Sequence, residues 1–408
     1  TVGRLRIDFN VDFYTSGSTS RSHAVETSRM QEDRVVNSEN RVRNRLAASK
    51  LILSYPVFGG ELSVGGEYVR THRTDMYSNP ERIVSSSDMT ADEWNSSLFA
   101  EYARETPIGQ LGVGLRYEHV RSDYLSDGRP LDGLNRNYNQ WFPNVSFGTR
   151  VKGVDLQLAY TAKTQRPSYR QLTSNVYYAN RLTLQTGNPL LKPTLTHDVS
   201  LTASWRIVQL TASYRQERDA VIDRTERSRI DPKVSLITYT NLDRLPLVTA
   251  FATVTPTFGV WTPQLSAGFV KQWAEVEIDG QPVRYDRPIF RISLNNSLRL
   301  PAGLLFTLDV RYRSKGDERN LYLTDDVWVV NMGLTRSFFS DRLSVMLRGW
   351  DVFRGEGGGA IYRSPHMESY QVDRYDSQEF ELTLRYRFNA AKSKYKGSGA
   401  GTGELERL

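Results

Sequence analysis

The fold is decided by a run near the start of the chain, Arg4-Leu5-Arg6-Ile7-Asp8-Phe9-Asn10-Val11-Asp12-Phe13. Polar and apolar residues alternate without error over these positions. Successive side chains of a β-strand point to opposite faces of a sheet, so a period of two predicts a strand with one polar and one apolar face. About sixteen runs of the chain alternate in this way, and the last of them is Glu379-Phe380-Glu381-Leu382-Thr383-Leu384-Arg385-Tyr386-Arg387-Phe388. The chain is therefore expected to be all-β.

The composition fits either a soluble protein or a membrane barrel. The chain has 408 residues, of which 24% are charged and 39% are hydrophobic. A barrel with a polar lumen and an apolar outer face reaches such averages, because the two faces of each strand cancel. No stretch approaches the ~18 uninterrupted apolar residues of a transmembrane helix. Spanning by helices is therefore excluded, and spanning by strands is not.

Charge, cysteine and histidine content argue against several functions. The 53 Lys and Arg residues are interleaved with 46 Asp and Glu residues, so no basic run predicts nucleic-acid binding. The chain has no cysteine. Its histidines lack the spacing of a metal site; they are His23, His72, His119, His197 and His366. No Gly-x-Ser-x-Gly elbow marks a nucleophile, so we expect no enzyme, no cofactor and no metal.

Short and long connections alternate between the expected strands. The short ones are Pro56–Gly60, Thr106–Gly109, Val151–Val154, Arg206–Val208, Phe258–Trp261, Leu300–Gly303 and Phe338–Asp341. The long ones cover residues 16–40, 73–93, 126–139, 165–192, 223–232, 275–288, 315–325 and 354–370. A soluble β-sandwich has no reason to sort its loops by length, whereas an outer-membrane barrel has short periplasmic turns and long extracellular loops.

We therefore predict a transmembrane antiparallel up-and-down β-barrel of about 16 strands over residues 1–388. The apolar face of each strand would meet lipid, and the polar face would line the lumen. With the short turns in the periplasm, the first strand runs outward and the last runs inward, which places both chain ends in the periplasm. Residues 389–408 are rich in Gly, Lys and Ser, so we expect a flexible periplasmic tail there.

Two segments resemble a known family. One is Gln165-Arg166-Pro167-Ser168-Tyr169, followed later by Gly187-Asn188-Pro189-Leu190-Leu191-Lys192-Pro193. This pair is similar to the long extracellular loop and the next strand of TonB-dependent outer-membrane receptors. The other segment, residues 394–401 with residues 404–408, resembles the periplasmic tail of the Bacteroidetes branch of that family. The motif residues are Arg166, Pro167, Gly187, Asn188, Pro189, Lys192 and Pro193.

The resemblance implies a function in a Gram-negative outer membrane. Receptors of this family bind, with their extracellular loops, a ligand too large for passive porins. A plug domain occludes the lumen, and energy relayed by TonB from the inner membrane moves the plug. The chain would supply the wall and the loops of such a transporter.

Two features depart from the family pattern. A complete receptor has an N-terminal plug and a barrel of about 22 strands. Our count is about six strands lower, and nothing before Leu5 resembles a plug or a TonB-contacting segment. The simplest expectation is that the chain is the C-terminal barrel portion of a larger receptor, whose TonB contact lies in a plug outside this chain. The alternative is a self-contained barrel with a porin-like number of strands.

The same sequence leaves two other functions open. One is a plugless passive channel, and the other is a non-transporting barrel that scaffolds a surface lipoprotein or an assembly complex. The expected surroundings are outer-membrane lipids and lipopolysaccharide. Phe388 ends the last predicted strand and resembles the terminal aromatic residue that the outer-membrane assembly machinery recognises.

Candidate ligand contacts lie in the longest connection. Tyr177, Tyr178 and Arg181 offer aromatic faces and a guanidinium that could hold a sugar, a peptide or a chelate by stacking and hydrogen bonds. Packing of the loop on itself explains the same residues equally well. Charged residues on the predicted inner faces, such as Arg116 and Glu118, are expected to form structural pairs rather than ligand contacts.

Overall fold

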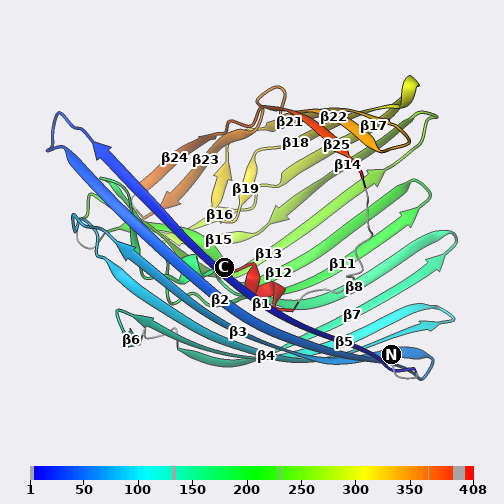
Figure 1. Ribbon diagram of the computed structural model, residues 1–408, viewed down its shortest axis with the longest axis horizontal. Helices are drawn as coiled ribbons and strands as arrows, with labels where there is room; N and C mark the ends of the chain where they lie inside the picture. Colours follow the sequence, from blue (N-terminus) through cyan, green and yellow to red (C-terminus); the bar gives the residue numbers. More distant parts are fainter. Residues whose placement is uncertain (1–3, 131–134, 229–230, 366, 389–399) are drawn as a thin grey trace.

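The computed structural model describes residues 4–130, 135–228, 231–365, 367–388 and 400–408. Sixteen of the 19 strands in the main sheet form one antiparallel meander (Figure 1). They are β1 (Arg6–Glu26), β2 (Arg34–Val57), β3 (Gly60–Ser78), β4 (Ser87–Thr106), β5 (Gly109–Ser126), β7 (Arg136–Val151), β8 (Val154–Gln165), β11 (Thr194–Trp205), β12 (Val208–Arg227), β13 (Ser235–Val254), β14 (Trp261–Gln272), β17 (Ile289–Leu300), β18 (Leu304–Arg313), β21 (Val327–Phe338), β22 (Leu343–Trp350) and β25 (Glu379–Tyr386). The predicted all-β meander and its strand number are confirmed.

Shorter elements fill the connections. They are β6 (Arg129–Pro130), α1 (Tyr169–Leu172), β9 (Val176–Asn180), β10 (Thr183–Thr186), β15 (Ala274–Ile278), β16 (Gln281–Tyr285), the 3-10 turn η1 (Pro301–Gly303), β19 (Gly316–Glu318), β20 (Leu321–Leu323), β23 (Gly357–Ser364), β24 (Met367–Arg374) and α2 (Thr402–Leu405). β10 also pairs in parallel with the start of β13. No helix among the described residues is long and apolar enough to cross a membrane.

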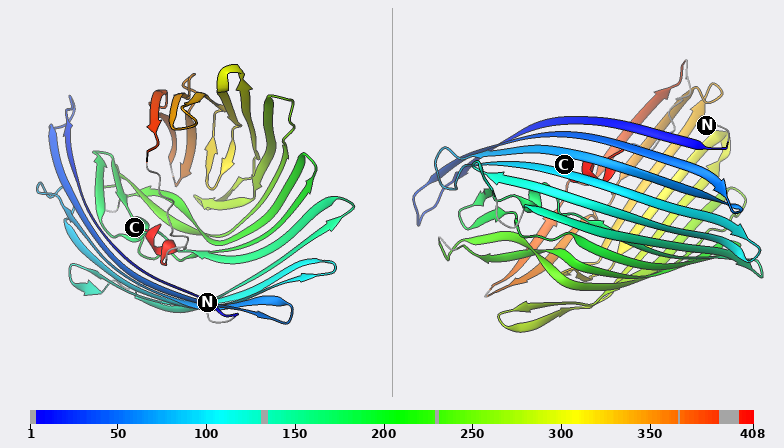
Figure 2. Two further views of the ribbon diagram at one scale, coloured as in Figure 1. Left: turned by 45° about the vertical axis from the view of Figure 1, so that its right-hand side comes forward. Right: turned by 90° about the horizontal axis from the view of Figure 1, so that it is seen from below.

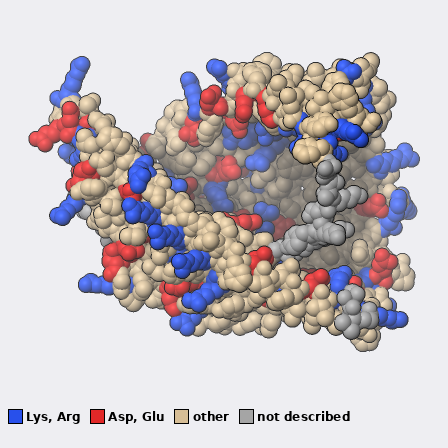
Figure 3. All heavy atoms as spheres, viewed as in Figure 1, with Lys and Arg blue, Asp and Glu red and all other residues tan. Residues whose placement is uncertain are grey.

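The meander forms a curved wall with two unpaired edges. Within the described residues, β1 pairs only with β2, and β25 pairs only with β22. Figure 2 shows the two edges on either side of a gap, with the hollow of the wall between them. Acidic and basic side chains are both visible inside this hollow (Figure 3).

The two faces of the wall have opposite chemistry. Apolar residues on the outer face are exposed to an extent that soluble proteins avoid: Phe13 is 81% exposed and Leu384 is 65% exposed. Polar residues of the concave face are instead buried, as Thr71 and Asp75 show. Soluble proteins bury apolar residues and expose polar ones, so this distribution is the reverse of theirs. It is the distribution expected where the outer face meets lipid.

The short connections are tight hairpins at one end of the sheet. β2 and β3 pair up to Val57 and Gly60, and the two residues between them have positive φ, 51° at Phe58 and 73° at Gly59. The β7–β8 hairpin has the same form, with positive φ at Lys152 and Gly153. Two-residue turns with positive φ at both positions match the twist of antiparallel strands, which explains why these connections are so short.

Several long connections contain more strand than the alternation predicted. β1 continues to Glu26 and β2 begins at Arg34, so most of the predicted loop 16–40 is paired backbone. Likewise, β3 ends at Ser78 and β4 begins at Ser87, inside the predicted loop 73–93. Beyond the membrane both faces of a hairpin meet water, so the apolar residues disappear from the pattern while backbone pairing continues. The predicted loops 275–288, 315–325 and 354–370 coincide largely with the hairpin β15–β16, the strands β19–β20 and the hairpin β23–β24, of which β24 continues past the predicted loop to Arg374.

The C-terminal segment, residues 400–408, lies in the hollow of the wall against its concave face (Figure 2). Ala400 is buried among Leu46, Ala48 and Val69. The flexible tail predicted for residues 389–408 does not describe this segment; residues 389–399 lie outside the described part of the chain. The composition argument failed because the apolar and charged partners of the segment come from the wall and not from the segment itself.

Candidate functional site

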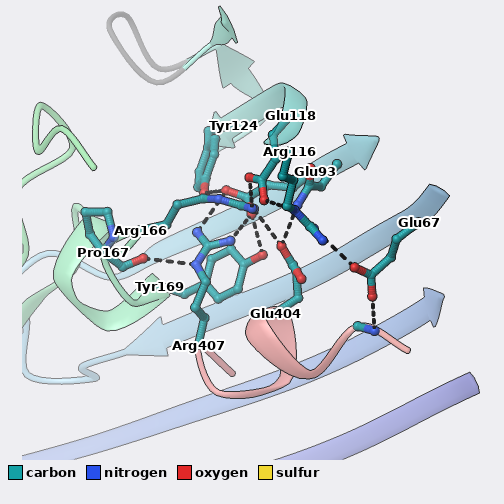
Figure 4. A network of polar contacts seen from close by, with 12 residues as sticks. Glu67, Glu93, Arg116, Glu118, Tyr124, Arg166, Pro167, Tyr169, Glu404 and Arg407 are labelled. Carbon is teal, nitrogen blue, oxygen red and sulfur yellow. Dashed lines mark hydrogen bonds and ion pairs between the residues drawn. The ribbon is translucent and has the colours of Figure 1, made fainter. Parts of the chain in front are cut away.

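A network of buried charges joins three parts of the chain on the concave face. It combines the wall strands β4 and β5, the start of the connection that follows β8, and the C-terminal segment (Figure 4). We call it the luminal ion-pair cluster, and it consists of Glu93, Glu118, Arg166, Glu404 and Arg407. Each of these side chains is at most 10% exposed.

Glu93 of β4 is the most heavily contacted member of the cluster. One carboxylate oxygen accepts hydrogen bonds from the Tyr124 hydroxyl and, at 3.1 Å, from Nη2 of Arg407. The other accepts a hydrogen bond from the Tyr169 hydroxyl at 2.8 Å and is paired with Nη1 of Arg407. A carboxylate withdrawn from water is tolerated only when its oxygens are hydrogen-bonded and its charge is paired. Glu93 meets both conditions, and Arg407 provides the charge.

Arg166 provides the second half of the cluster. Its guanidinium lies 2.7 Å from the carboxylate of Glu404 and 3.4 Å from that of Glu118. Burial alone would lower the pKa of Arg166, but the acidic groups around it, Glu404 first and then Tyr138 and Glu93, together outweigh burial and raise the pKa above its ordinary value. Arg166 therefore stays charged and ties the β8–β11 connection to both the wall and the C-terminal segment.

A row of wall charges extends the cluster along the concave face. Arg116 donates to Glu118 at 2.8 Å and to Glu67 at 3.2 Å. Glu67 in turn accepts a hydrogen bond from the backbone N–H of Gly401 at 2.9 Å. The structural pairing expected for the inner-face charges Arg116 and Glu118 is thus present, and it continues into the C-terminal segment.

Local sequence explains why α1 presents Tyr169 to this cluster. The Ser168 side chain accepts a hydrogen bond from the backbone N–H of Gln171, whose own side chain accepts one from the backbone N–H of Ser168, which forms a capping box. The turn buries Tyr169 and Leu172 against the wall. The guanidinium of Arg407 lies 4.6 Å from the centre of the Tyr169 ring, within the range of a cation–π contact.

The motif around Gly187 fixes the return of the connection to the wall. A Cβ atom on Gly187 would lie 2.5 Å from the carbonyl oxygen of Thr173 and 2.7 Å from that of Gln171, so only glycine fits. Asn188 donates its backbone N–H to the Gln171 carbonyl at 2.6 Å and its side-chain amide to the Tyr239 carbonyl at 2.8 Å. The connection is therefore closed on itself and attached to β13.

The rest of the motif has a similar structural role. The Pro189 carbonyl accepts a hydrogen bond from Arg136 of β7 at 3.1 Å. Lys192 donates its backbone N–H to Asn241 of β13 at 2.8 Å, and Pro193 directly precedes β11. At the other end of the connection, the Pro167 carbonyl accepts a hydrogen bond from Nε of Arg407 at 3.2 Å. The motif thus attaches the connection to the wall and to the C-terminal segment.

The hairpin β9–β10 brings together the three residues predicted as ligand contacts. The Tyr178 hydroxyl donates to Glu26 of β1 at 2.8 Å. Arg181 pairs with the same carboxylate at 3.4 Å and donates to the side chain of Gln31 at 2.8 Å. Tyr177 makes an edge-to-face contact with Tyr77 at 5.0 Å between ring centres. All three side chains contact residues outside their own connection, on β1, on β3 and in the turn that follows β1.

A cavity lies between the wall strands and the hairpin strands of their long connections. Its volume is about 660 Å³, and its lining combines basic and acidic side chains with the glycine strand β23. Members of the lining are Arg291, Arg311, Arg313, Glu318, Tyr362 and Asp373. The cavity lies beside the strands β17, β18 and β21 and does not include the luminal ion-pair cluster.

Sequence reasoning missed most of the luminal ion-pair cluster. Glu93 falls inside a predicted loop, and Glu404 and Arg407 fall in a segment expected to be flexible. Arg166 was singled out only through its motif. The available signal was the group of charged residues Glu404, Glu406 and Arg407 near the end of a tail that is otherwise rich in small and basic residues.

Comparison with known proteins gives a family match over nearly the whole chain. A family model described as "Outer membrane protein beta-barrel family" matches residues 3–386. No curated protein gives a significant sequence match.

Solved structures share the fold at low sequence identity. The copper transporter OprC aligns with a TM-score of 0.66 at 13% identity, covering 94% of this chain and 62% of its own. The ferric-catecholate import receptor Fiu from Escherichia coli K12 aligns with a TM-score of 0.60 at 13% identity, covering 93% and 62%. The ferric citrate transporter FecA, in its unliganded form, aligns with a TM-score of 0.57 at 10% identity, covering 93% and 58%. The chain thus spans less than two thirds of each of these structures.

Proposed function

This chain belongs to the outer membrane protein beta-barrel family, and on that premise we propose that it forms the wall and extracellular loops of a TonB-dependent receptor. In this proposal the loops bind a ligand, and uptake across the outer membrane is driven by TonB through a plug that is not part of this chain. In this proposal the short hairpins and the N-terminal end of the chain lie on the periplasmic side, whereas the C-terminal segment lies inside the hollow of the wall and not in the periplasm as expected from the sequence. Lipopolysaccharide and the assembly machinery, the latter through Phe388, complete the set of partners.

The observation that carries the proposal is the pair of unpaired edges in the wall. β1 and β25 each have one free edge within the described residues, and the apolar outer face flanks both. Unpaired backbone N–H and C=O groups are costly in the hydrocarbon region, so a wall in lipid must be closed by further strands. Additional strands of the same protein would enlarge the barrel to about 22 strands, the size of known plugged transporters. The fold shared with the transporters and receptors described above supports this size.

The outer end of the wall supplies the ligand surface in this proposal. Hydrogen bonds from Tyr178 and Arg181 attach the β9–β10 hairpin to the end of β1 and to the turn that follows it, and Tyr177, Tyr178 and Arg181 remain partly exposed there. Their rings and guanidinium offer stacking and charged hydrogen bonds to a ligand that rests on the hairpin.

Three measurements on the intact protein from its native outer membrane test the proposal. We expect a polypeptide mass well above the 46.6 kDa of this chain, retention of the protein by the immobilised periplasmic domain of TonB, and no steady conductance in planar bilayers. A mass near 46.6 kDa together with large, steady openings would overturn the proposal in favour of a passive channel. Stoichiometric recovery of a surface lipoprotein without TonB binding would overturn it in favour of a scaffold.

A further inference from the structure

The C-terminal segment occupies a site that the wall and the β8–β11 connection build together. We propose that this site binds a short peptide segment in which an acidic residue precedes an arginine by three positions, and that residues 400–408 are its tethered occupant. The site comprises the wall partners Asp12, Glu67, Glu93, Asn95 and Glu118 together with Arg166 and Pro167.

The segment is held along its whole described length. Its backbone N–H groups at Ala400 and Gly401 donate to carboxylates of β1 and β3. Glu404 accepts a hydrogen bond from Asn95 of β4 at 3.0 Å and pairs with Arg166. The segment therefore contacts several wall strands and the connection that leaves β8.

The spacing of Glu404 and Arg407 fits the two charges of the site. Residues three apart lie on the same side of a helical turn, and the backbone N–H of Arg407 donates to the Glu404 carbonyl at 3.2 Å in the turn that follows α2. Glu404 thereby meets Arg166 while Arg407 meets Glu93. A segment with the two charges exchanged would place like charges together on both sides, so the site discriminates by the order of the residues.

Glycine and alanine at the start of the segment are also required. Gly401 has a φ of +71°, and a Cβ atom there would lie 2.8 Å from the Cβ of Ala48 and 3.3 Å from a methyl group of Leu46. Ala400 is 1% exposed against the same apolar patch. The site therefore requires a small residue at position 400 and a glycine in the left-handed conformation at position 401, before the charged turn. These two requirements exclude peptides that have the right charges but larger residues at these positions.

Removal of the segment would leave the site incomplete. Of the contacts described above, Glu93 would keep only the hydroxyls of Tyr124 and Tyr169, and Arg166 would keep only Glu118. The segment also bridges the wall and the connection, because Arg407 contacts both Glu93 and the Pro167 carbonyl. Occupancy of the site thus adds to the attachment of the β8–β11 connection to the wall.

A peptide-binding experiment on the full-length protein tests the site. The probe is a fluorescent peptide with the sequence of residues 400–408, and the control peptide has the residues corresponding to Glu404 and Arg407 exchanged. Deletion of residues 400–408 vacates the site, and the vacated chain should bind the probe, whereas the unmodified chain should bind it at least about tenfold more weakly because its own segment competes. Adding Glu93→Gln to the vacated chain should weaken probe binding by about tenfold or more.

The outcomes that contradict the proposal are distinct. Equal binding of the probe and the exchanged peptide would overturn the recognition of charge order. Equal binding of the probe to the unmodified and vacated chains would overturn tethered occupancy. Absence of binding to the vacated chain, with its fold confirmed by heat-modifiable mobility, would overturn the site itself.

A second measurement does not depend on disrupting the cluster. The sequence has no cysteine, so Ala400→Cys and Thr402→Cys each introduce a single thiol. Position 400 is buried and position 402 is exposed in the docked segment. In full-length protein we expect a maleimide to modify position 402 rapidly and position 400 at least about tenfold more slowly. Equal rates at the two positions would overturn the docking of the segment.

Discussion

Glu93 of β4 and Arg407 of the C-terminal segment form a two-pronged ion pair across 314 residues of sequence. Both side chains are 8% exposed. A pair that is so well shielded from water differs from the exposed pairs on the outer loops, because removal of one partner leaves a charge that water reaches poorly.

Arg407→Ala should destabilise the protein, lowering the free energy of unfolding by about 2–3 kcal/mol. Arg284→Ala is the matched control, since Arg284 pairs with Glu275 at 3.0 Å while both side chains are more than half exposed. That substitution should change the free energy by less than about 0.5 kcal/mol. Urea-induced unfolding in lipid vesicles measures both. A similar loss of unfolding free energy in the two variants would show that the Glu93–Arg407 pair stabilises the protein no more than an exposed pair does.

Gly187→Ala should loosen the β8–β11 connection, because the new methyl group would collide with the carbonyl oxygens of Thr173 and Gln171. We expect severalfold faster cleavage of the connection by added protease on intact cells. Gly17→Ala is the control, since the contact of its Cβ atom with the Val42 carbonyl would be an ordinary 3.8 Å. Unchanged cleavage of the Gly187 variant would contradict a structural role for this motif.

Phe388→Ala should reduce the amount of folded protein in the outer membrane if the last aromatic residue is an assembly signal. Phe388 is 75% exposed, so its loss removes little packing from the chain itself. Phe353→Ala provides a matched control, because Phe353 is 72% exposed and lies in the connection after β22, whereas Phe388 directly follows the last strand, β25. Heat-modifiable mobility of outer-membrane protein on gels measures the folded fraction. Equal yields of the two variants would remove the assembly role from Phe388.

Acid should weaken the attachment of the connection between β22 and β25. Asp351 accepts backbone hydrogen bonds from Gly355 and Glu356, both at 2.8 Å. Burial acts to raise the pKa of the Asp351 carboxyl, but the hydrogen bonds from Ser377 and these two N–H groups outweigh burial and lower it below the ordinary 3.8. Because the folded state favours the carboxylate, the stabilisation is fully present above the ordinary pKa and is lost as the pH falls through the lowered folded-state pKa.

Asp351→Asn tests this pH dependence. The variant should have a connection that is opened more easily at neutral pH, and the difference from the unmodified chain should shrink as the pH falls below about 4. Hydrogen exchange of residues 355–356 measures it. A difference between the two chains that stays constant down to strongly acidic pH would rule out Asp351 as the titrating group.

The wall was predictable because its physics is local in sequence. Alternation of the kind seen at Leu5 and Ile7 reports which face of a strand meets lipid, and the tight hairpins, such as the one at Phe58 and Gly59, carry their own turn chemistry. The alternation stopped being informative at Ser16, where β1 leaves the apolar surroundings but continues to pair with β2.

The luminal ion-pair cluster was not predictable in the same way. Glu93 takes its partners from Tyr124, Tyr169 and Arg407, which lie 31, 76 and 314 residues away. The periodicity of residues within one strand carries no information about contacts between residues so far apart in the sequence. The family motif identified Arg166 and Gly187, but not the fact that Arg166 faces Glu404. A composition rich in small residues also concealed the docking turn of the C-terminal segment, because its partners lie in distant strands.

The hydrogen bond from Ala400 to Asp12 spans 388 positions of the chain. Closing so long a loop is entropically unfavourable until the strands between its ends are already in register. This contact should therefore be among the last to form during assembly. Docking of the segment would then serve as a built-in marker of maturity, separating a finished wall from a half-inserted intermediate.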